Sequence, residues 1–246
     1  MDILVTSGGT KIPVDRVRDI TNMSNGTFGS RIAHAALEAG HAVHFLCAKH
    51  SKTPFSKTLD YSEGRDWMDD INEWANFWNF CEEHAPRYRE TRFRNYDDYA
   101  QNLEVAVQMG KPDVVILAAA VSDYGVTNFV EGKVRTGSQN AIQLFPLPKL
   151  INRIKRWHPN CLLVGFKLLM NSNDEQLIKA ARMSLRDNGC DFVVANDLRD
   201  LQANNHRLLI VREDEVHVFS KSDSPDPLYL AKKVIEEVHL CPATSC

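Results

Sequence analysis

Three polar residues stand where an apolar run or a glycine turn gives way to a loop, and their types suit phosphate chemistry. Asp123 follows the apolar segment 113–120, whose small final residues leave room for a flat ring or a phosphate chain. Its carboxylate could hold Mg²⁺ (or Mn²⁺) that bridges phosphates, or it could cap a turn or a helix. Lys133, in a loop where a lysine is usually just solvated, could close over a phosphate. Asn22 could hold a carbonyl or an oxyanion as a neutral donor, or it could stabilise its own loop.

The first apolar run ends in a glycine turn. Residues 3–6 lead into a Ser-Gly-Gly-Thr motif, which predicts a buried strand with Gly8, Gly9 and Thr10 at its carboxyl end. In open α/β sheets, ligands bind beyond such strand ends. A glycine turn there is about as often structural, and the following sequence departs from the G-x-G-x-x-G pattern of an ordinary dinucleotide site.

A second loop, over residues 22–29, leads into a predicted helix over 30–39. The unpaired N–H groups at the start of a helix and the positive end of its dipole favour phosphate. Gly26 allows a ligand to approach the backbone closely, and Ser24 and Asn25 add hydrogen-bond donors. This loop is therefore a candidate phosphate cradle.

The elements that must position these residues follow an α/β pattern. The chain starts with a strand, a helix and a strand, and near-continuous apolar runs follow, which favours a mostly parallel sheet flanked by helices. Asn196-Asp197 marks a third polar strand end. Further strands are predicted over 42–47, 113–120, 162–167 and 191–196, a hairpin over 207–211 and 215–219, and helices from Pro148, over 175–188 and over 229–238.

An acidic and then basic region, residues 63–99, predicts a helical insertion. Trp67, Ile71, Trp74 and Trp78 fall on one helical face. That face predicts a helix packed on the domain; the alternative is a lid or a subunit contact, where aromatic and arginine side chains are enriched.

Two other segments lack regular patterning. Residues 129–147 contain little periodicity and predict a mobile flap, and residues 240–246 predict a frayed tail. The whole chain, 1–246, otherwise reads as one domain.

Composition limits the function classes. The net charge is -3, which argues against nucleic-acid binding because that calls for a strongly basic face. The six cysteines form no C-x-x-C pair and are expected to be reduced thiols. No signal peptide and no membrane-spanning run is evident, so a cytoplasmic protein without membrane contact is expected.

Several of these segments together resemble the signature of phosphopantothenate–cysteine ligases. They occur in the family's order and cover most of the chain, while about 60–105 matches weakly. The matching motifs are VTSGGT at 5–10, VDRVRDITNMSNG at 14–26, AAVSDY at 119–124, GFKL at 165–168 and AND at 195–197. The resemblance is to the stand-alone ligase, because no flavin-binding decarboxylase domain precedes these motifs.

The resemblance implies a Rossmann-like fold, a homodimer with a small flap or dimerisation element, and a two-step reaction of coenzyme A biosynthesis. The carboxylate of 4'-phosphopantothenate would attack the α-phosphate of CTP or ATP, and L-cysteine would then displace the nucleoside monophosphate. By the same resemblance, Lys133 would stabilise charge at the α-phosphate, Asp123 would carry the divalent ion, and Asn22 would hold the acyl intermediate. Residues that would bind phosphates or border the nucleotide are Gly8, Gly9, Thr10, Ser24, Asn25, Gly26, Ala119, Ala120, Pro148, Lys149, Leu150, Ile151 and Phe166.

Two features of the sequence leave alternatives open. In the predicted phosphate cradle, the family often has a serine where Asn25 stands. Some bacterial members carry lysines on the helix that here reads ARMSLRDN over 181–188, and GFKL at 165–168 also resembles the eukaryotic and stand-alone bacterial members, so CTP and ATP both stay possible. A non-catalytic or altered-substrate nucleotide-binding homologue is the main rival. An NAD(P)-dependent reductase is a weaker one, since the Tyr229 and Lys233 pair has the right spacing but lies on the terminal helix.

Overall fold

Parallel strands and one antiparallel hairpin form an eight-stranded sheet within the described part of the chain. The computed structural model describes residues 1–56, 67–135, 141–203 and 205–241. Ile3 pairs with Val43 on one side and with Val114 on the other, so the first strand lies inside the sheet. The strand order is β12-β11-β10-β9-β6-β1-β4-β5. The bounds are β1 (Asp2–Ser7), β4 (Ala42–Ala48), β5 (Tyr88–Phe93), β6 (Val114–Leu117), β9 (Leu162–Leu169), β10 (Phe192–Asp197), β11 (Arg207–Val211) and β12 (Val216–Ser220).

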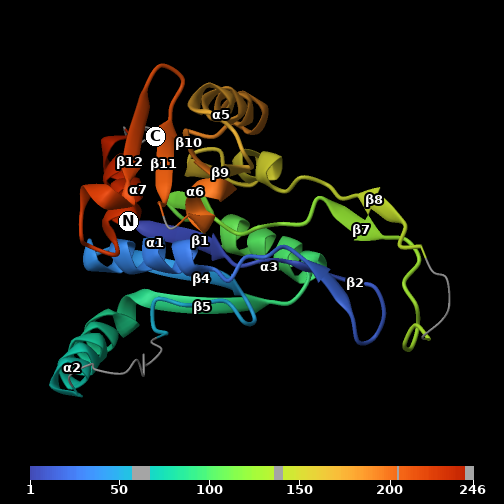
Figure 1. The fold of residues 1–246 in the computed structure, drawn as a ribbon, viewed down its shortest axis with the longest axis horizontal. Coiled ribbons are helices and arrows are strands. Elements are labelled where there is room, and N and C mark those ends of the chain that lie inside the picture. Colours follow the sequence, from blue (N-terminus) through green and yellow to red (C-terminus); the bar gives the residue numbers. More distant parts are fainter. Residues whose placement is uncertain (57–66, 136–140, 204, 242–246) are drawn as a thin grey trace.

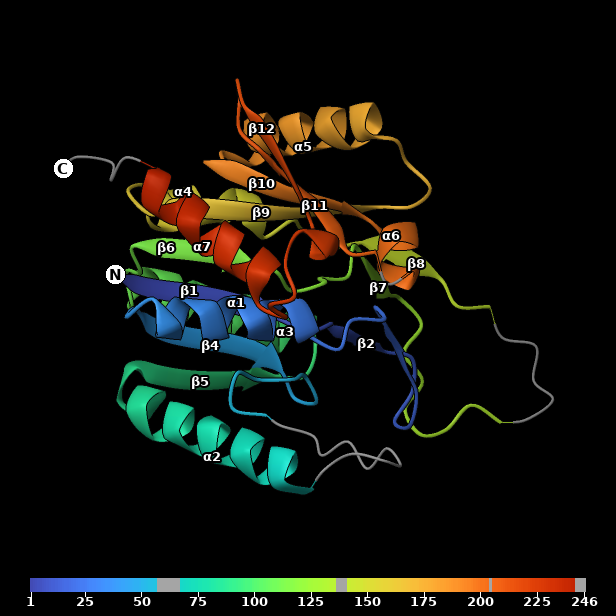
Figure 2. The same ribbon diagram turned by 60° about the vertical axis from the view of Figure 1, so that its left-hand side comes forward.

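Helices cover both faces of this sheet (Figure 2). On one face, α1 (Thr27–Glu38) and α7 (Tyr229–Leu240) pack over the central strands. On the other face lie α3 (Tyr96–Gln108), α4 (Ile154–Trp157) and α5 (Asp174–Asn188). The predicted α/β architecture with a mostly parallel sheet is confirmed. Helices lie on both sides because the apolar strands of a parallel sheet have to be covered on both faces.

Several element boundaries differ from the prediction. α1 starts at Thr27 rather than at residue 30, because Gly26 adopts a left-handed conformation with φ 76° and turns the loop directly into the helix. β6 ends at Leu117 rather than at residue 120, because the N–H of Ala119 donates to the Thr6 hydroxyl at 3.2 Å instead of continuing the ladder. The short helices are η1 (Ala85–Arg87), η2 (Ile151–Arg153), α6 (Leu198–Gln202) and η3 (Lys221–Asp223).

Two short antiparallel ribbons project together from the body of the molecule (Figure 1). One consists of β2 (Lys11–Pro13) and β3 (Asp19–Thr21), and the other of β7 (Tyr124–Val126) and β8 (Leu144–Pro146). The second ribbon includes part of the predicted flap over 129–147, so three of those residues form a strand where little regular structure was expected. We call the ribbons and their connecting loops the first arm, residues 11–21, and the second arm, residues 124–146; residues 136–140 lie outside the described residues.

The prediction that the face with Ile71, Trp74 and Trp78 packs on the domain is wrong. α2 (Trp67–His84) is helical, but Ile71, Trp74 and Trp78 are 52%, 37% and 64% exposed. The helix instead contacts the domain through Phe80, whose ring stacks on His34 with centroids 3.8 Å apart. The reason is that another face of the helix, with Phe77, Phe80 and His84, is less exposed, and its Phe80 meets α1.

α7 ends at Leu240, and the predicted frayed tail over 240–246 lies almost wholly outside the described residues. Among the helices that the structure describes, none combines the length and the apolar character needed to span a membrane. The described cysteines, Cys47, Cys81, Cys161, Cys190 and Cys241, all carry free thiols.

Candidate active site

The start of α1 is a tight cradle of glycine and serine. The Ser7 hydroxyl donates to the carbonyl of Gly26 at 3.0 Å, which ties the end of β1 to the helix start. A Cβ on Gly26 would lie 1.7 Å from the Ser51 oxygen, and one on Gly29 would lie 2.5 Å from that of Ser7. In α1, which the structure describes throughout, the N-cap position is Gly26, which has no capping side chain, and no acidic residue lies in the first turn. The positive end of this helix therefore carries no acidic side chain of its own and suits a phosphate.

A loop that the sequence prediction missed completes this cradle. The backbone N–H of Lys52 donates to the carbonyl of Asn25 at 3.0 Å. Ser51 is 8% exposed, and its hydroxyl lies 3.4 Å from the same carbonyl. The Asn25 side chain accepts from the backbone N–H of Thr27 at 3.1 Å, so it also braces the helix start. No motif marks residues 51–52, because their role depends on the return of the chain after β4.

The ends of β1 and β6 are joined by hydrogen bonds that bring three predicted segments together. The Asn22 side chain donates to the carbonyl of Ala120 at 2.9 Å, and the Thr10 N–H donates to the same oxygen at 3.2 Å. The Ala120 N–H donates to the carbonyl of Gly8 at 2.8 Å. The buried hydroxyl of Thr10 accepts from the Ser122 N–H at 2.9 Å. The glycine turn, Asn22 and the Ala-Ala-Val-Ser-Asp segment therefore share the carboxyl edge of the sheet, as the sequence predicted.

Asp123 follows this junction and is exposed, with its carbonyl accepting from the Leu147 N–H at 2.8 Å. Among the described residues, no three His, Cys, Asp or Glu side chains gather as a metal site. A single exposed carboxylate at this edge of the sheet still fits Mg²⁺, which is usually held by one or two carboxylates and the phosphates of the substrate.

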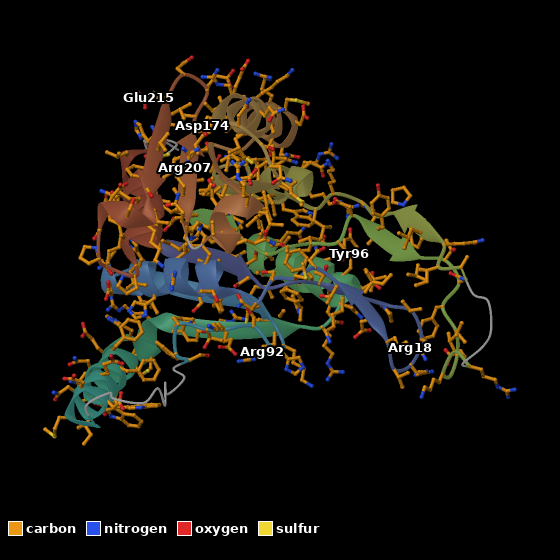
Figure 3. All side chains as sticks on the ribbon, in the orientation of Figure 1. Arg18, Arg92, Tyr96, Asp174, Arg207 and Glu215 are labelled. Atoms are coloured by element: carbon orange, nitrogen blue, oxygen red, sulfur yellow. The ribbon has the colours of Figure 1, made fainter. Side chains whose placement is uncertain are left out.

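Lys133 lies on the second arm, and its segment is bonded to the first arm. The Arg16 N–H donates to the carbonyl of Gly132 at 2.9 Å. Asp15 accepts from the N–H of Val134 at 3.0 Å, and this bond is the main reason that the pKa of Asp15 lies below its usual value. Arg18 marks the turn of the first arm in Figure 3, away from the sheet. The segment that carries Lys133 thus lies on the outer part of the arms (Figure 1). Asn22, by contrast, lies at the sheet edge through its bond to Ala120, and Asp123 follows that junction closely in the chain.

The predicted nucleotide border follows the end of the second arm. The carbonyl of Pro148 accepts from the hydroxyl of Tyr96 at 2.5 Å, which ties this border to the start of α3 (Figure 3). Lys149 is exposed, and Leu150 is buried at 6% exposure. Ile151 opens η2 and packs beside the core below α3 and α4. Tyr96 was missed because its partner is distant in sequence.

An aromatic group lies at the other side of this edge. Phe166 on β9 meets Phe28 on α1 edge to face, with ring centroids 6.0 Å apart. His206 lies against the same Phe28 ring at 5.0 Å, and its Nε2 is buried without a hydrogen-bond partner. Burial lowers the pKa of His206 to about 4, so its ring is neutral at pH 7. Phe28 and His206 were not predicted, since neither belongs to a recognisable motif.

Asp197, at the polar end of β10, has a structural role. Asp197 is 1% exposed and accepts from the N–H groups of Ser172 at 2.7 Å and Arg199 at 2.8 Å. The bond from Ser172 is the main cause of the lowered pKa of this carboxyl. Asp197 therefore braces the loop before α5 and caps α6, rather than facing a ligand.

Comparison with known proteins places most of the chain in one family. Residues 1–66 and 98–240 match the family model described as the DNA/pantothenate metabolism flavoprotein C-terminal domain. The stretch left unmatched, 67–97, contains α2 and β5. The insertion with the exposed tryptophans is thus the part of the chain that departs from the family pattern.

Individual relatives cover most of this chain. It is 31% identical over 212 residues to the coenzyme A biosynthesis bifunctional protein CoaBC of Thermococcus kodakarensis. The matched region covers 86% of this chain and 45% of that protein. It is 30% identical over 223 residues to phosphopantothenate–cysteine ligase 2 of Oryza sativa subsp. japonica, at 80% and 68% coverage. The chain therefore spans less than half of the Thermococcus protein and about two thirds of the rice protein. The crystal structure of the DNA/pantothenate metabolism flavoprotein from Streptococcus pneumoniae superposes with a TM-score of 0.76 at 26% identity, covering 97% of this chain and 98% of that one.

Proposed function

This chain belongs to the family of DNA/pantothenate metabolism flavoprotein C-terminal domains, and on that premise we propose that it is a phosphopantothenate–cysteine ligase of coenzyme A biosynthesis. The observation that carries the proposal is the junction at the carboxyl edge, where Asn22 and the Gly8–Thr10 turn bond to Ala120 and where α1 begins without an acidic residue in its first turn. Such an edge offers N–H groups and a helix dipole to phosphates and a neutral donor to an acyl group.

In the first step, a carboxylate oxygen of 4'-phosphopantothenate attacks the α-phosphorus of CTP or ATP. The bond from that phosphorus to the bridging oxygen breaks, and pyrophosphate leaves with the electron pair. Both reactants are anions, so their approach needs cations and N–H dipoles held in place. We assign Lys133 to the charge that develops at the α-phosphate, and Ser24, Asn25 and Gly26 to the phosphate cradle.

In the second step, the amine of L-cysteine attacks the acyl carbon of the resulting mixed anhydride. The acyl carbon–oxygen bond breaks, the nucleoside monophosphate leaves, and the amine loses a proton as the amide forms. We assign Asn22 to holding the acyl group, because its side-chain amide already lies at the sheet edge through its bond to Ala120. Phe166, Ala119 and the border 148–151 would enclose the nucleotide.

Mg²⁺ or Mn²⁺ would supply charge neutralisation to the triphosphate, and Asp123 is the carboxylate that we assign to it. The exposure of Asp123 supports this assignment, since an ion carried by phosphates has to reach its protein ligand from solvent. The free thiols of the described cysteines are in keeping with a reducing compartment, and we propose a cytoplasmic location.

We also propose a homodimer that forms through the two arms. The arms extend beyond the body of the domain (Figure 1). They also expose large apolar side chains. Tyr124, Leu144 and Phe145 are 55%, 53% and 41% exposed. A short ribbon with such side chains is marginal alone and gains from burial against another surface.

The experiment that tests the function is pyrophosphate release from purified protein with Mg²⁺, 4'-phosphopantothenate and L-cysteine, run separately with CTP and with ATP. We expect release that depends on phosphopantothenate, and the faster nucleotide identifies the co-substrate. No release with either nucleotide would refute the ligase and leave the non-catalytic or altered-substrate homologue.

A further inference from the structure

Asp15 joins the two arms through a buried carboxylate. Its side chain is fully shielded from solvent, although the residue lies in the exposed turn of the first arm. One carboxylate oxygen accepts from the N–H groups of Val17 and Arg18, both at 2.8 Å. The other oxygen accepts from the N–H of Val134, at 3.0 Å, across to the second arm. A single side chain therefore shapes the turn of one arm and holds the other arm.

The bonds between the arms fall on both sides of Lys133. Before it, the carbonyl of Gly132 accepts from the Arg16 N–H at 2.9 Å. After it, the N–H of Val134 donates to Asp15, and the Val134 carbonyl accepts from the Arg18 side chain at 3.2 Å. The two peptide groups that flank Lys133 are thus both attached to the first arm.

Other contacts join the arms further from Lys133: the Val130 N–H donates to the carbonyl of Val14 at 3.1 Å. The ion pair of Arg16 and Glu131 has side chains that are 66% and 72% exposed, so solvent screens it. A Cβ on Gly132 would meet nothing within 4 Å, so packing does not confine the backbone there. The buried, charge-assisted bond from Val134 to Asp15 is the contact best suited to fix the position of Lys133.

We propose that Asp15 is a positioning residue that holds the Lys133 segment in place for the first step of the proposed ligase reaction. The inference rests on the proposed function only for its catalytic consequence. The attachment of the second arm by Asp15 is a property of the protein without substrate, so the two parts are tested separately.

Asp15→Asn weakens the bond between the arms, and it also removes the carboxylate charge that lies 3.8 Å from the Arg18 guanidinium. The asparagine oxygen can still accept from Val17 and Arg18, but its NH₂ group would face the N–H of Val134, donor against donor. The matched control is Asp19→Asn on the same arm, because Asp19 pairs with Lys11 at 3.4 Å through side chains that are 38% and 43% exposed. Amide hydrogen exchange without ligand should be about tenfold faster at Val134 in Asp15→Asn and unchanged in the control. Equal exchange at Val134 in all three proteins would overturn the attachment, whatever the activity.

Two half-reactions then test the positioning role. Pyrophosphate release should fall by about tenfold or more in Asp15→Asn, whereas release of nucleoside monophosphate from added 4'-phosphopantothenoyl nucleotidylate and cysteine should keep its rate. A variant that is merely less folded would lose both rates in proportion. Equal losses in the two half-reactions, or no loss in either, would overturn the positioning role. If the unaltered protein releases no pyrophosphate, the proposed function fails, while the exchange of Val134 still decides the attachment.

Discussion

Replacing Gly26 by alanine should destabilise the start of α1 by two separable effects. Gly26 has φ 76°, a left-handed conformation that costs a residue with a Cβ about 1–2 kcal/mol. The added Cβ would also lie 1.7 Å from the hydroxyl oxygen of Ser51 and 2.7 Å from that of Ser7. Both serines are buried, so they have to shift within a packed site, which typically costs about 1–3 kcal/mol. The expected loss in the free energy of unfolding is therefore about 2–5 kcal/mol.

The same helix supplies the matched control for backbone strain. Gly40, just after the C-terminal end of α1, has φ 86°, and a Cβ there would meet only a side-chain atom of Arg87 at 3.5 Å. Gly40→Ala should therefore show the strain alone, about 1–2 kcal/mol. Ser51→Gly, combined with Gly26→Ala, should recover part of the difference, because it removes the side chain that the new Cβ approaches most closely.

Urea unfolding of the four proteins measures these differences, provided that the slope with denaturant stays constant. For a chain of this size, 1 kcal/mol corresponds to about 2–4 °C in Tm, so thermal unfolding gives an independent reading. If Gly26→Ala loses no more stability than Gly40→Ala, the close contact of the cradle with Ser51 is wrong. If Gly26→Ala binds phosphopantothenate and nucleotide as tightly as the unaltered protein, the cradle is not the phosphate site.

The remaining predictions concern pH, the second step and assembly. Burial lowers the pKa of His44 and His206 to about 4, below the usual 6.5, so between these values the unfolded chain binds protons that the folded protein does not. The free energy of unfolding should therefore fall from pH 6.5 towards pH 4. At pH 5 the loss should be roughly 1 kcal/mol per histidine, after allowance for the partial exposure of these side chains. A Tm that stays constant over this range would contradict the burial of the two histidines. Asn22→Asp should still release pyrophosphate but form little amide, as followed by mass spectrometry; normal amide yield would remove Asn22 from the second step. Leu144→Asp should convert the proposed dimer into a monomer by light scattering while Trp78→Asp leaves it intact, and the reverse result would move the interface to α2.

The parts of the fold that the sequence predicts are those where local pattern and tertiary burial agree. The apolar runs of β1, β6 and β10 are buried on both sheet faces, and their lack of alternation with polar residues indicates that burial directly. α5 carries both end signals, since Asn173 forms a capping box and Gly189 ends the helix with φ 67°. Such elements depend on interactions within a few residues, which a single sequence displays.

The elements that the sequence did not predict depend on partners far along the chain. β5, an edge strand, reads as polar because half of its side chains face solvent. The tryptophans of α2 have helical spacing, yet the contact with the domain is made by Phe80, whose partner His34 lies on another helix. Spacing identifies a face of a helix but does not say which of two apolar stripes meets the core.

The candidate site shows the same division. Glycines, Asn22 and Asp123 could be placed at one sheet edge, because parallel strands bring their carboxyl ends together. Their supports could not: Ser51 reaches the cradle by the loop after β4, Tyr96 reaches the nucleotide border from α3, and Asp15 meets Val134 over 119 positions. Those contacts depend on how loops pack against each other, and the spacing of apolar residues along the sequence does not indicate that packing.

The structure divides the proposed reaction between a rigid edge and a projecting pair of arms. The glycine turn and Asn22 are tied to the ends of buried strands, so they can hold phosphate and acyl groups without rearrangement. Lys133 instead lies on a segment attached mainly by hydrogen bonds to the neighbouring arm, and such contacts open at lower cost than a packed core. A cation needed only while a triphosphate is bound is better carried on such a segment, because it can meet the developing charge and then release pyrophosphate. The strength of the bond between Asp15 and Val134 would then set how far the segment moves, which links the stability of the arms to the rate of the first step.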